Sequence, residues 1–109
     1  MPWTYAATTS EFSGRDAIAV ECGGRRVALY RLDDGVFATS DVCPHQGASL
    51  AQGCVVQGFI ECPLHFALFD IRTGEADGAM TTRAVTTYPT RVEHGTIYVD
   101  LSDSEESAS

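Results

Sequence analysis

The stretch CPHQGASLAQGCVVQGFIECPLH, residues 43–65, holds three of the four cysteines and two of the three histidines of this 109-residue chain. One residue separates Cys43 from His45, and two residues separate Cys62 from His65. Each half of the stretch therefore offers one thiolate and one imidazole, which are ligands that suit transition metals. The pattern predicts that two loops supply a shared metal centre.

Four interpretations of this pattern compete. Chance is a poor one, because cysteine is uncommon and both pairs lie in one short stretch. Structural zinc accepts two cysteines and two histidines, but its usual gaps of about two to four residues fit the single residue between Cys43 and His45 poorly. A nucleophilic thiol with His45 as its base lacks a visible third group to orient the base. The fourth interpretation is a 2Fe–2S cluster in which two histidines replace two cysteines on one iron.

The sequence resembles one family in particular. CPHQG (43–47) followed by CPLH (62–65) is similar to the signature C-x-H…C-x-x-H of Rieske proteins. FDIRTGEA (69–76) and TTYPTRVEHGTIYV (86–99) resemble the stretches after the cluster in soluble Rieske ferredoxins of bacterial aromatic-ring-hydroxylating dioxygenase systems. The resemblance is strong over residues 36–101 and looser over the N-terminal strands.

This resemblance implies a ligand set and a cofactor. Cys43 and Cys62 would bind one iron of a Rieske-type 2Fe–2S cluster, and His45 and His65 would bind the other from the tips of two loops. Two neutral imidazoles in place of two thiolates remove two negative charges, so an added electron meets less repulsion than in an all-cysteine cluster. The electron is expected to settle on the histidine-bound iron. No catalytic residue is predicted.

Two features of high-potential, respiratory-chain Rieske proteins are missing: a disulfide that clamps the ligand loops, and hydroxyl donors near the cluster. Ala48 and Leu64 occupy the positions of an extra pair of disulfide-bonded cysteines, and Ala67 and Phe69 occupy those of a serine and a tyrosine that donate hydrogen bonds to cluster sulfurs. Such donors stabilise the more negative reduced cluster. We therefore expect a reduction potential near the low end of the Rieske range, at about −150 mV.

Other residues near the motif receive more modest interpretations. Cys22, at a strand end, and Cys54, which opens a strand, are expected to be buried structural thiols. His94 precedes a glycine in a turn and is expected to face solvent. Phe66 could shield the cluster, contribute to a docking surface or simply pack. Met80 stands where the family often has a proline in a third loop that covers the cluster.

The rest of the chain predicts an all-β fold. Short β-branched and apolar runs alternate with turn signals such as GG and DDG, and no helical periodicity is sustained. We expect an antiparallel β-barrel or sandwich base with a small cluster-binding loop subdomain, which is the Rieske fold. Strands are expected at residues 17–22, 25–32, 36–40, 67–71, 84–93 and 96–101, with two more inside 55–61.

Composition suits a single domain of ordinary globular type. We expect one Rieske domain over residues 1–101, with its cluster-binding subdomain at about 41–71, and a flexible acidic tail over 102–109. The formal net charge of −8 argues against nucleic acid and favours encounters with basic protein surfaces. No apolar run is long enough for a membrane span, and the first ten residues do not resemble a signal peptide. A cytoplasmic monomer is expected.

The resemblance implies an electron carrier and not an enzyme. The protein would carry single electrons from an NAD(P)H-dependent flavoprotein reductase to a terminal Rieske non-haem iron oxygenase in aromatic compound degradation. An oxygenase domain is excluded, because after His45 and His65 only His94 remains for a mononuclear iron site. A Rieske small subunit of another redox complex, such as a nitrite-reductase-like one, is the alternative, and a zinc-stabilised binding module is a more distant one.

Overall fold

The computed structural model describes residues 3–44, 47–63, 67–77 and 84–102. Within these ranges the chain forms three antiparallel sheets and two single-turn 3-10 helices, η1 (Thr9–Phe12) and η2 (Leu50–Gln52). Neither of these helices is long and apolar enough to cross a membrane. The predicted all-β class is confirmed.

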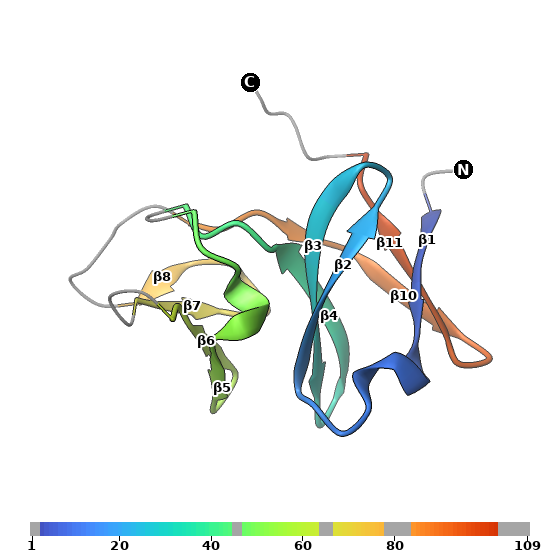
Figure 1. The fold of residues 1–109 in the computed structure, drawn as a ribbon, viewed down its shortest axis with the longest axis horizontal. Coiled ribbons are helices and arrows are strands. Elements are labelled where there is room, and N and C mark those ends of the chain that lie inside the picture. Colours follow the sequence, from blue (N-terminus) through green and yellow to red (C-terminus); the bar gives the residue numbers. More distant parts are fainter. Residues whose placement is uncertain (1–2, 45–46, 64–66, 78–83, 103–109) are drawn as a thin grey trace.

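Two of the sheets build a base, and the third lies to one side of it (Figure 1). The first sheet has the order β1–β11–β10 and contains β1 (Trp3–Thr8), β10 (Thr90–Glu93) and β11 (Thr96–Asp100). The second has the order β2–β3–β4–β9 and contains β2 (Ala17–Cys22), β3 (Arg25–Leu32), β4 (Gly35–Ser40) and β9 (Thr87–Tyr88). The third has the order β5–β6–β7–β8 and contains β5 (Cys54–Val56), β6 (Phe59–Glu61), β7 (Leu68–Asp70) and β8 (Ala76–Asp77).

Local turn chemistry explains the hairpins of the base. Gly23 and Gly24 join β2 to β3 with φ angles of +59° and +83°, a left-handed backbone that glycine adopts without steric cost. Residues 17–22 then pair in register with residues 25–30. Strands β3 and β4 pair in the same way across the DDG turn, with Leu32 opposite Gly35. The predicted hairpins at both turns are therefore confirmed.

Strand β3 is buried on both faces and separates two cores. Val27 and Leu29 belong to the first core, and Ala28 and Tyr30 belong to the second. Successive side chains of a strand point to opposite faces, so one strand can supply both cores. The first core fills the base and includes Phe12, Ile18, Ile97 and Val99. The second core lies between the base and the third sheet and includes Cys43, Leu50, Ile60, Cys62, Phe69 and Val85.

Two strands of the base differ from the prediction. The expected single strand at 84–93 is wrong, because it is divided at Pro89 into β9, which pairs with β4, and β10, which pairs with β11. Proline lacks the N–H group that a continuous ladder needs, so the chain can leave one sheet and enter another at this point. Strand β1, which pairs with β11 at the other end of the chain, was not expected.

Candidate metal centre

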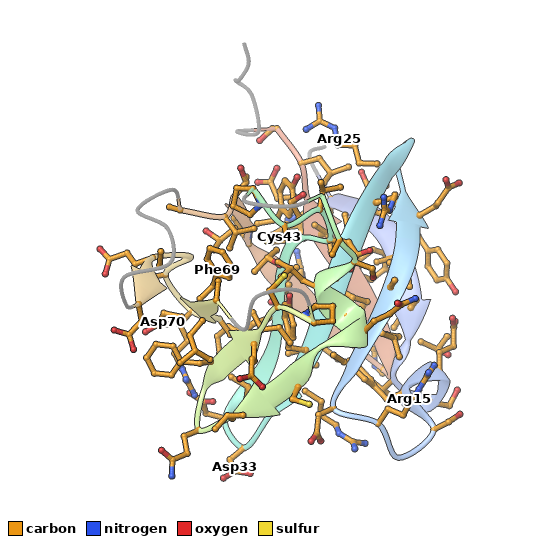
Figure 2. All side chains as sticks on the ribbon, turned by 60° about the vertical axis from the view of Figure 1, so that its left-hand side comes forward. Arg15, Arg25, Asp33, Cys43, Phe69 and Asp70 are labelled. Atoms are coloured by element: carbon orange, nitrogen blue, oxygen red, sulfur yellow. The ribbon has the colours of Figure 1, made fainter. Side chains whose placement is uncertain are left out.

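Cys43 and Cys62 are both buried in the second core, with side chains that are 1% and 0% exposed. Cys43 follows the end of β4, and Cys62 follows β6 directly. Their core includes Leu50, Ile60 and Phe69, so apolar groups exclude water from the surroundings of the thiols. Figure 2 shows Cys43 and Phe69 in the interior, between the base and the third sheet.

The two cysteines begin loops that are closed in the same way. The Cys43 N–H donates to the carbonyl oxygen of Ala48 at 2.9 Å, and the Cys62 N–H donates to that of Ala67 at 2.7 Å. Both bonds span the same number of residues. The Gly47 N–H also donates to the Cys43 carbonyl at 2.8 Å, and Gly47 has a left-handed φ of +76°. Each cysteine therefore lies at the base of a loop of equal size, which fits a centre held from two sides.

The predicted histidine ligands, His45 and His65, lie outside the described residues, as do Leu64, Phe66 and Met80. The described part of the chain contains no group of three His, Cys, Asp or Glu side chains placed to bind a metal. The structure thus brings the two predicted cysteines into one core. The assignment of His45 and His65 as ligands rests on the sequence motif. A donor set of two sulfurs and two imidazole nitrogens suits a mixed-ligand 2Fe–2S cluster.

The buried carboxylate of Asp41 braces the first loop, although no sequence motif marks this residue. Asp41 is 1% exposed, and its Oδ1 accepts hydrogen bonds from Ser49 Oγ at 3.0 Å and from the Ala51 N–H at 2.9 Å. Its Oδ2 accepts one from Arg26 Nη2 at 3.0 Å. The Leu50 N–H donates to the Asp41 carbonyl at 2.7 Å. These bonds fix the residues on both sides of the loop to the edge of the base.

A hydroxyl chain lies in the same core. Thr39 Oγ1 donates to the Ser40 carbonyl at 2.8 Å, so the Tyr30 hydroxyl donates to Thr39 Oγ1, also at 2.8 Å. Burial raises the pKa of Tyr30 well above its ordinary value; the bond to Thr39 offsets part of this rise, and the nearby Asp41 carboxylate adds to it. Tyr30 is therefore a neutral donor in one wall of the core that holds the cysteines.

Arg72 fastens the third sheet to the base. Its Nη2 donates to Asp34 Oδ1 at 2.6 Å, and its guanidinium lies over the Phe37 ring at 5.1 Å from the centroid. The hydrogen bond from Arg72 lowers the pKa of the Asp34 carboxyl. The turn that carries Arg72 is held by Asp70, whose carboxylate accepts the backbone N–H of Arg72 at 2.8 Å and that of Thr73 at 3.2 Å.

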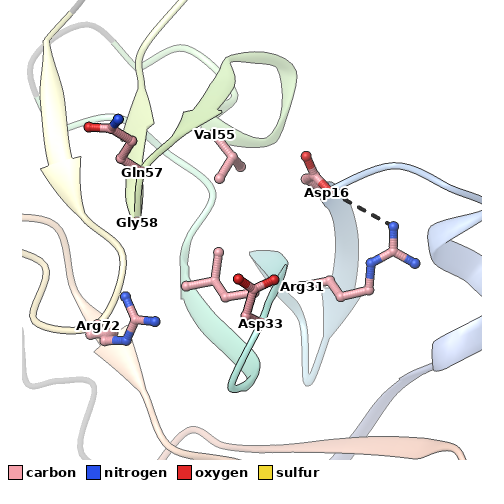
Figure 3. Close-up of a pocket in the computed structure, with 8 residues that line it drawn as sticks. Asp16, Arg31, Asp33, Val55, Gln57, Gly58 and Arg72 are labelled. Carbon is pink, nitrogen blue, oxygen red and sulfur yellow. Dashed lines mark ion pairs between the residues drawn. The ribbon is translucent and has the colours of Figure 1, made fainter.

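A cleft of about 430 Å³ separates the β5–β6 hairpin from the base (Figure 3). Arg31 faces it and pairs with Asp16 at 3.8 Å, and Arg72 on the opposite side pairs with Asp34. Each of these two arginines forms an ion pair with an aspartate. The cleft between the base and the third sheet is therefore polar and offers no unpaired arginine to a ligand. Its lining is completed by Leu32, Asp33, Val55, Gln57 and Gly58.

The remaining thiols divide differently from the prediction. Cys22 is buried as expected, and its thiol donates to the Tyr5 carbonyl at 3.4 Å while burial raises its pKa. The prediction that Cys54 is buried is wrong, because it is exposed. Cys54 opposes Glu61 on the outer face of the third sheet, whereas its neighbour Val55 points to the core. All four cysteines are within the described ranges, and none forms a disulfide.

The other positions named from the sequence agree with it where the structure describes them. Ala67 and Phe69, which replace the hydroxyl donors of high-potential proteins, are both buried in the second core. His94 lies in the β10–β11 turn with an exposed side chain and a φ of +52°, as predicted.

Comparison with known proteins decides the family. The profile described as Rieske [2Fe-2S] domain matches residues 2–89. The chain belongs to the Rieske [2Fe–2S] family. The predicted 2Fe–2S cofactor is thereby confirmed, and the buried cysteines at the bases of two matched loops fit it.

Relatives of this Rieske domain are ferredoxins of aromatic dioxygenase systems. It is 35% identical over 100 residues to the ferredoxin component of the naphthalene 1,2-dioxygenase system of Pseudomonas putida, which covers 92% of this chain and 96% of the relative. The solved ferredoxin of carbazole 1,9a-dioxygenase from Nocardioides aromaticivorans IC177 matches with a TM-score of 0.83 and 31% identity, over 91% of this chain and 97% of that one. A ferredoxin in a complex of reduced oxygenase and oxidised ferredoxin of carbazole 1,9a-dioxygenase matches with a TM-score of 0.81 and 30% identity, over 91% and 93%. The resemblance and the Rieske fold predicted from the sequence are confirmed.

Proposed function

We propose that this protein is the ferredoxin of an aromatic-ring dioxygenase system. It accepts single electrons from an NAD(P)H-dependent flavoprotein reductase and delivers them to a terminal Rieske non-haem iron oxygenase. The observation that carries the proposal is the pair of buried cysteines at the bases of two equal loops, in a chain whose relatives are ferredoxin components over nearly their whole length. A complex of ferredoxin with oxygenase is known for the carbazole system. The protein is an electron carrier and has no catalytic residue of its own.

The proposed ligands are Cys43 and Cys62 on one iron and His45 and His65 on the other. A 2Fe–2S cluster held by these residues would supply one-electron redox chemistry. The chain contributes a rigid, dry setting for it. The core around the cysteines excludes water, and the Asp41 brace limits movement of the first loop when the charge changes.

The absence of hydroxyl groups at Ala67 and Phe69 supports a low potential. Both side chains are buried beside the cysteines, so neither position can donate a side-chain hydrogen bond to the cluster. A carrier with a potential of about −150 mV would pass electrons onward from a reduced flavoprotein to an oxygenase.

We further propose that residues 1–101 form a single domain with the cluster-binding part at about 41–71, followed by an acidic tail at 102–109. Pairing of β1 with β11 supports this, because it joins the two ends of the described chain in one sheet. The protein is proposed to act as a monomer in the cytoplasm. Four cysteines without a disulfide are in keeping with a reducing compartment.

The test of the ligand set compares two cysteines of the same stretch. The purified protein should show the visible absorption of a Rieske cluster and become paramagnetic on reduction, and Cys43→Ser should lose this signal. Cys54→Ser, the matched control, should keep it, since Cys54 is exposed on the outer face of the third sheet. A cluster that survives in Cys43→Ser would contradict the assignment.

The test of the function is a reconstituted electron-transfer assay. NADH or NADPH, a flavoprotein reductase, this protein and a terminal oxygenase should together turn over an aromatic substrate, and omission of this protein should abolish turnover. Failure to reduce any terminal oxygenase of an aromatic dioxygenase system, with an intact cluster present, would refute the proposal.

A further inference from the structure

The third sheet turns one row of side chains inward. Val55, Ile60, Phe69 and Ala76 oppose one another across the four strands, and all four pack in or against the second core. The neighbouring positions along each strand must therefore point away from this core, because side chains of a strand alternate between faces. The sheet thus has an outer face of its own.

This outer face combines apolar and acidic residues. One cross-strand row places Leu68 between Glu61 and Asp77, and the next places Phe59 beside Asp70. Cys54, opposite Glu61, is also on the outer face; we call the other six residues the acidic face: Val56, Phe59, Glu61, Leu68, Asp70 and Asp77.

The acidic face has the composition of a protein-docking surface. Val56 is 45% exposed and lies opposite the partly exposed Phe59, and the partly exposed Leu68 lies in the neighbouring row. Three carboxylates are interspersed with these apolar side chains in the two rows, with Asp77 exposed and Glu61 and Asp70 partly exposed. Apolar and polar side chains are combined in this way in specific protein interfaces. Asp70 lies at the outer edge of the molecule in Figure 2.

The part of the chain that contains this face carries half of the formal net charge of −8. Residues 41–77 contain five acidic side chains and one basic side chain, residues 1–40 contain five and four, and residues 78–109 contain five and two. The one basic residue, Arg72, is paired with Asp34 of the base. The ion pairs formed within the described ranges involve none of the three carboxylates of the acidic face. The Asp70 carboxylate is engaged by the backbone N–H groups of Arg72 and Thr73, so Glu61 and Asp77 are the carboxylates of this face that we assign to a partner.

The acidic face begins at the second ligand loop. Glu61 directly precedes Cys62, and Leu68 directly follows Ala67, whose carbonyl closes the loop. Glu61 and Leu68 also oppose each other across β6 and β7. A partner bound on this face would consequently touch the strands that enter and leave a ligand loop.

We infer that the acidic face docks the terminal oxygenase, through an oxygenase surface with lysine or arginine side chains around an apolar contact. This inference rests on the proposed function. The choice of partner follows from charge, because the protein gains one negative charge when it accepts an electron. A basic surface on the partner binds the reduced ferredoxin more tightly than the oxidised ferredoxin. The terminal oxygenase needs this preference, because it takes its electron from the reduced ferredoxin. The reductase needs the opposite preference, since it must bind the oxidised form and release the reduced one.

The test measures electron transfer from reduced ferredoxin to oxidised terminal oxygenase by stopped flow, without the reductase. The double variant Glu61→Gln/Asp77→Asn removes two charges from the acidic face. The control Glu21→Gln/Asp33→Asn removes two exposed charges from the base. At low ionic strength we expect the second-order rate constant to fall about five-fold in the first variant and less than about two-fold in the control.

Salt dependence separates docking from a change in potential. The wild-type rate should fall as salt rises and should converge with that of Glu61→Gln/Asp77→Asn at about 0.5 M salt, because screening removes the same attraction that the substitutions remove. A difference in potential alone would persist at high salt. The visible spectrum and midpoint potential of each variant confirm that its cluster is intact.

Two results would overturn the inference and leave the proposed function standing: an unchanged rate and salt slope in Glu61→Gln/Asp77→Asn, or an equal loss in the Glu21→Gln/Asp33→Asn control. In both cases the wild-type protein still reduces the oxygenase. A wild-type protein that reduces no terminal oxygenase would instead overturn the proposed function itself.

Discussion

Replacing Asp41 with alanine would remove the acceptor of three hydrogen bonds beside the first ligand loop. The Ala51 N–H and the Ser49 hydroxyl would lose a buried charged acceptor, at a cost of about 1–1.5 kcal/mol each. The ion pair with Arg26 adds less than about 1 kcal/mol, because the Arg26 side chain is half exposed. We therefore expect a loss of about 3 kcal/mol, or roughly 12 °C in Tm for a domain of this size.

Three further variants remove part of the same set of hydrogen bonds around Asp41 and should cost less stability. Asp41→Asn keeps an oxygen acceptor but loses the charge, so it should cost about 1–2 kcal/mol. Ser49→Ala removes one hydrogen bond and should cost about 1 kcal/mol, and Arg26→Ala should cost less. Thermal scans followed by far-ultraviolet circular dichroism and by cluster absorbance should rank the four variants in this order. Scan rate is held constant, because loss of the cluster makes unfolding irreversible.

Circular dichroism and cluster absorbance together distinguish a local role of Asp41 at the ligand loop from a contribution to the stability of the whole domain. Asp41→Ala should lose cluster absorbance below the temperature at which its secondary structure melts, since the brace acts first on the ligand loop. If Asp41→Ala melts within about 2 °C of the wild type, or no earlier than Ser49→Ala, the structural assignment of Asp41 is wrong.

Three other predictions follow from particular residues. Phe69→Tyr introduces a hydroxyl group into the second core, beside Cys43 and Cys62. It should raise the midpoint potential by about 20–65 mV, which is the free energy of one hydrogen bond converted for a one-electron couple. Potentiometric titration measures this change, and a lower potential would contradict the prediction. Gly53→Ala should lower the free energy of unfolding by about 3 kcal/mol or more, because the new Cβ would overlap the backbone oxygen of Glu61. Gly14→Ala meets no atom and should lower it by about 1 kcal/mol. Urea unfolding compares the two variants, and equal losses of stability would contradict the close contact at Gly53. Arg72 lowers the pKa of Asp34, so the stabilisation from this pair is present above the unfolded-state pKa of the carboxyl and is lost as pH falls through the lower folded-state value. The amount by which the Tm of Arg72→Ala lies below that of the wild type should therefore shrink from about pH 6 to about pH 3, and a constant difference would refute this.

Features that depend on neighbouring residues could be predicted from the sequence. The glycine turn at 23–24 and the ligand motif are local patterns, so the hairpins, the family and the cluster followed from them. The position of Asp41 two residues before Cys43 was equally visible, but its role was not. Its hydrogen bonds exist only because the chain returns to it at Ser49 and Ala51.

Features that depend on distant pairing or on the choice of face could not be predicted. Strand β1 pairs with β11 at the other end of the chain. Trp3, Thr4 and Tyr5 favour strands, but their partner lies too far along the chain for a local pattern to identify it. Cys54, Val55 and Val56 are all apolar, so the sequence does not tell which of them faces the core. The pairing of Cys54 with Glu61 decides it, and places Cys54 on the outside.

The sharing of β3 between two cores limits how this protein could be re-engineered. The ligand loops are short and lie in one continuous segment of the sequence, which suggests that this segment alone could be grafted onto another protein. Their interior wall, however, is built from Ala28 and Tyr30, which alternate with Val27 and Leu29 on the same strand. A graft that left β3 behind would lose that wall. The smallest portable unit is therefore the third sheet together with the hairpins of the base, which is most of the chain.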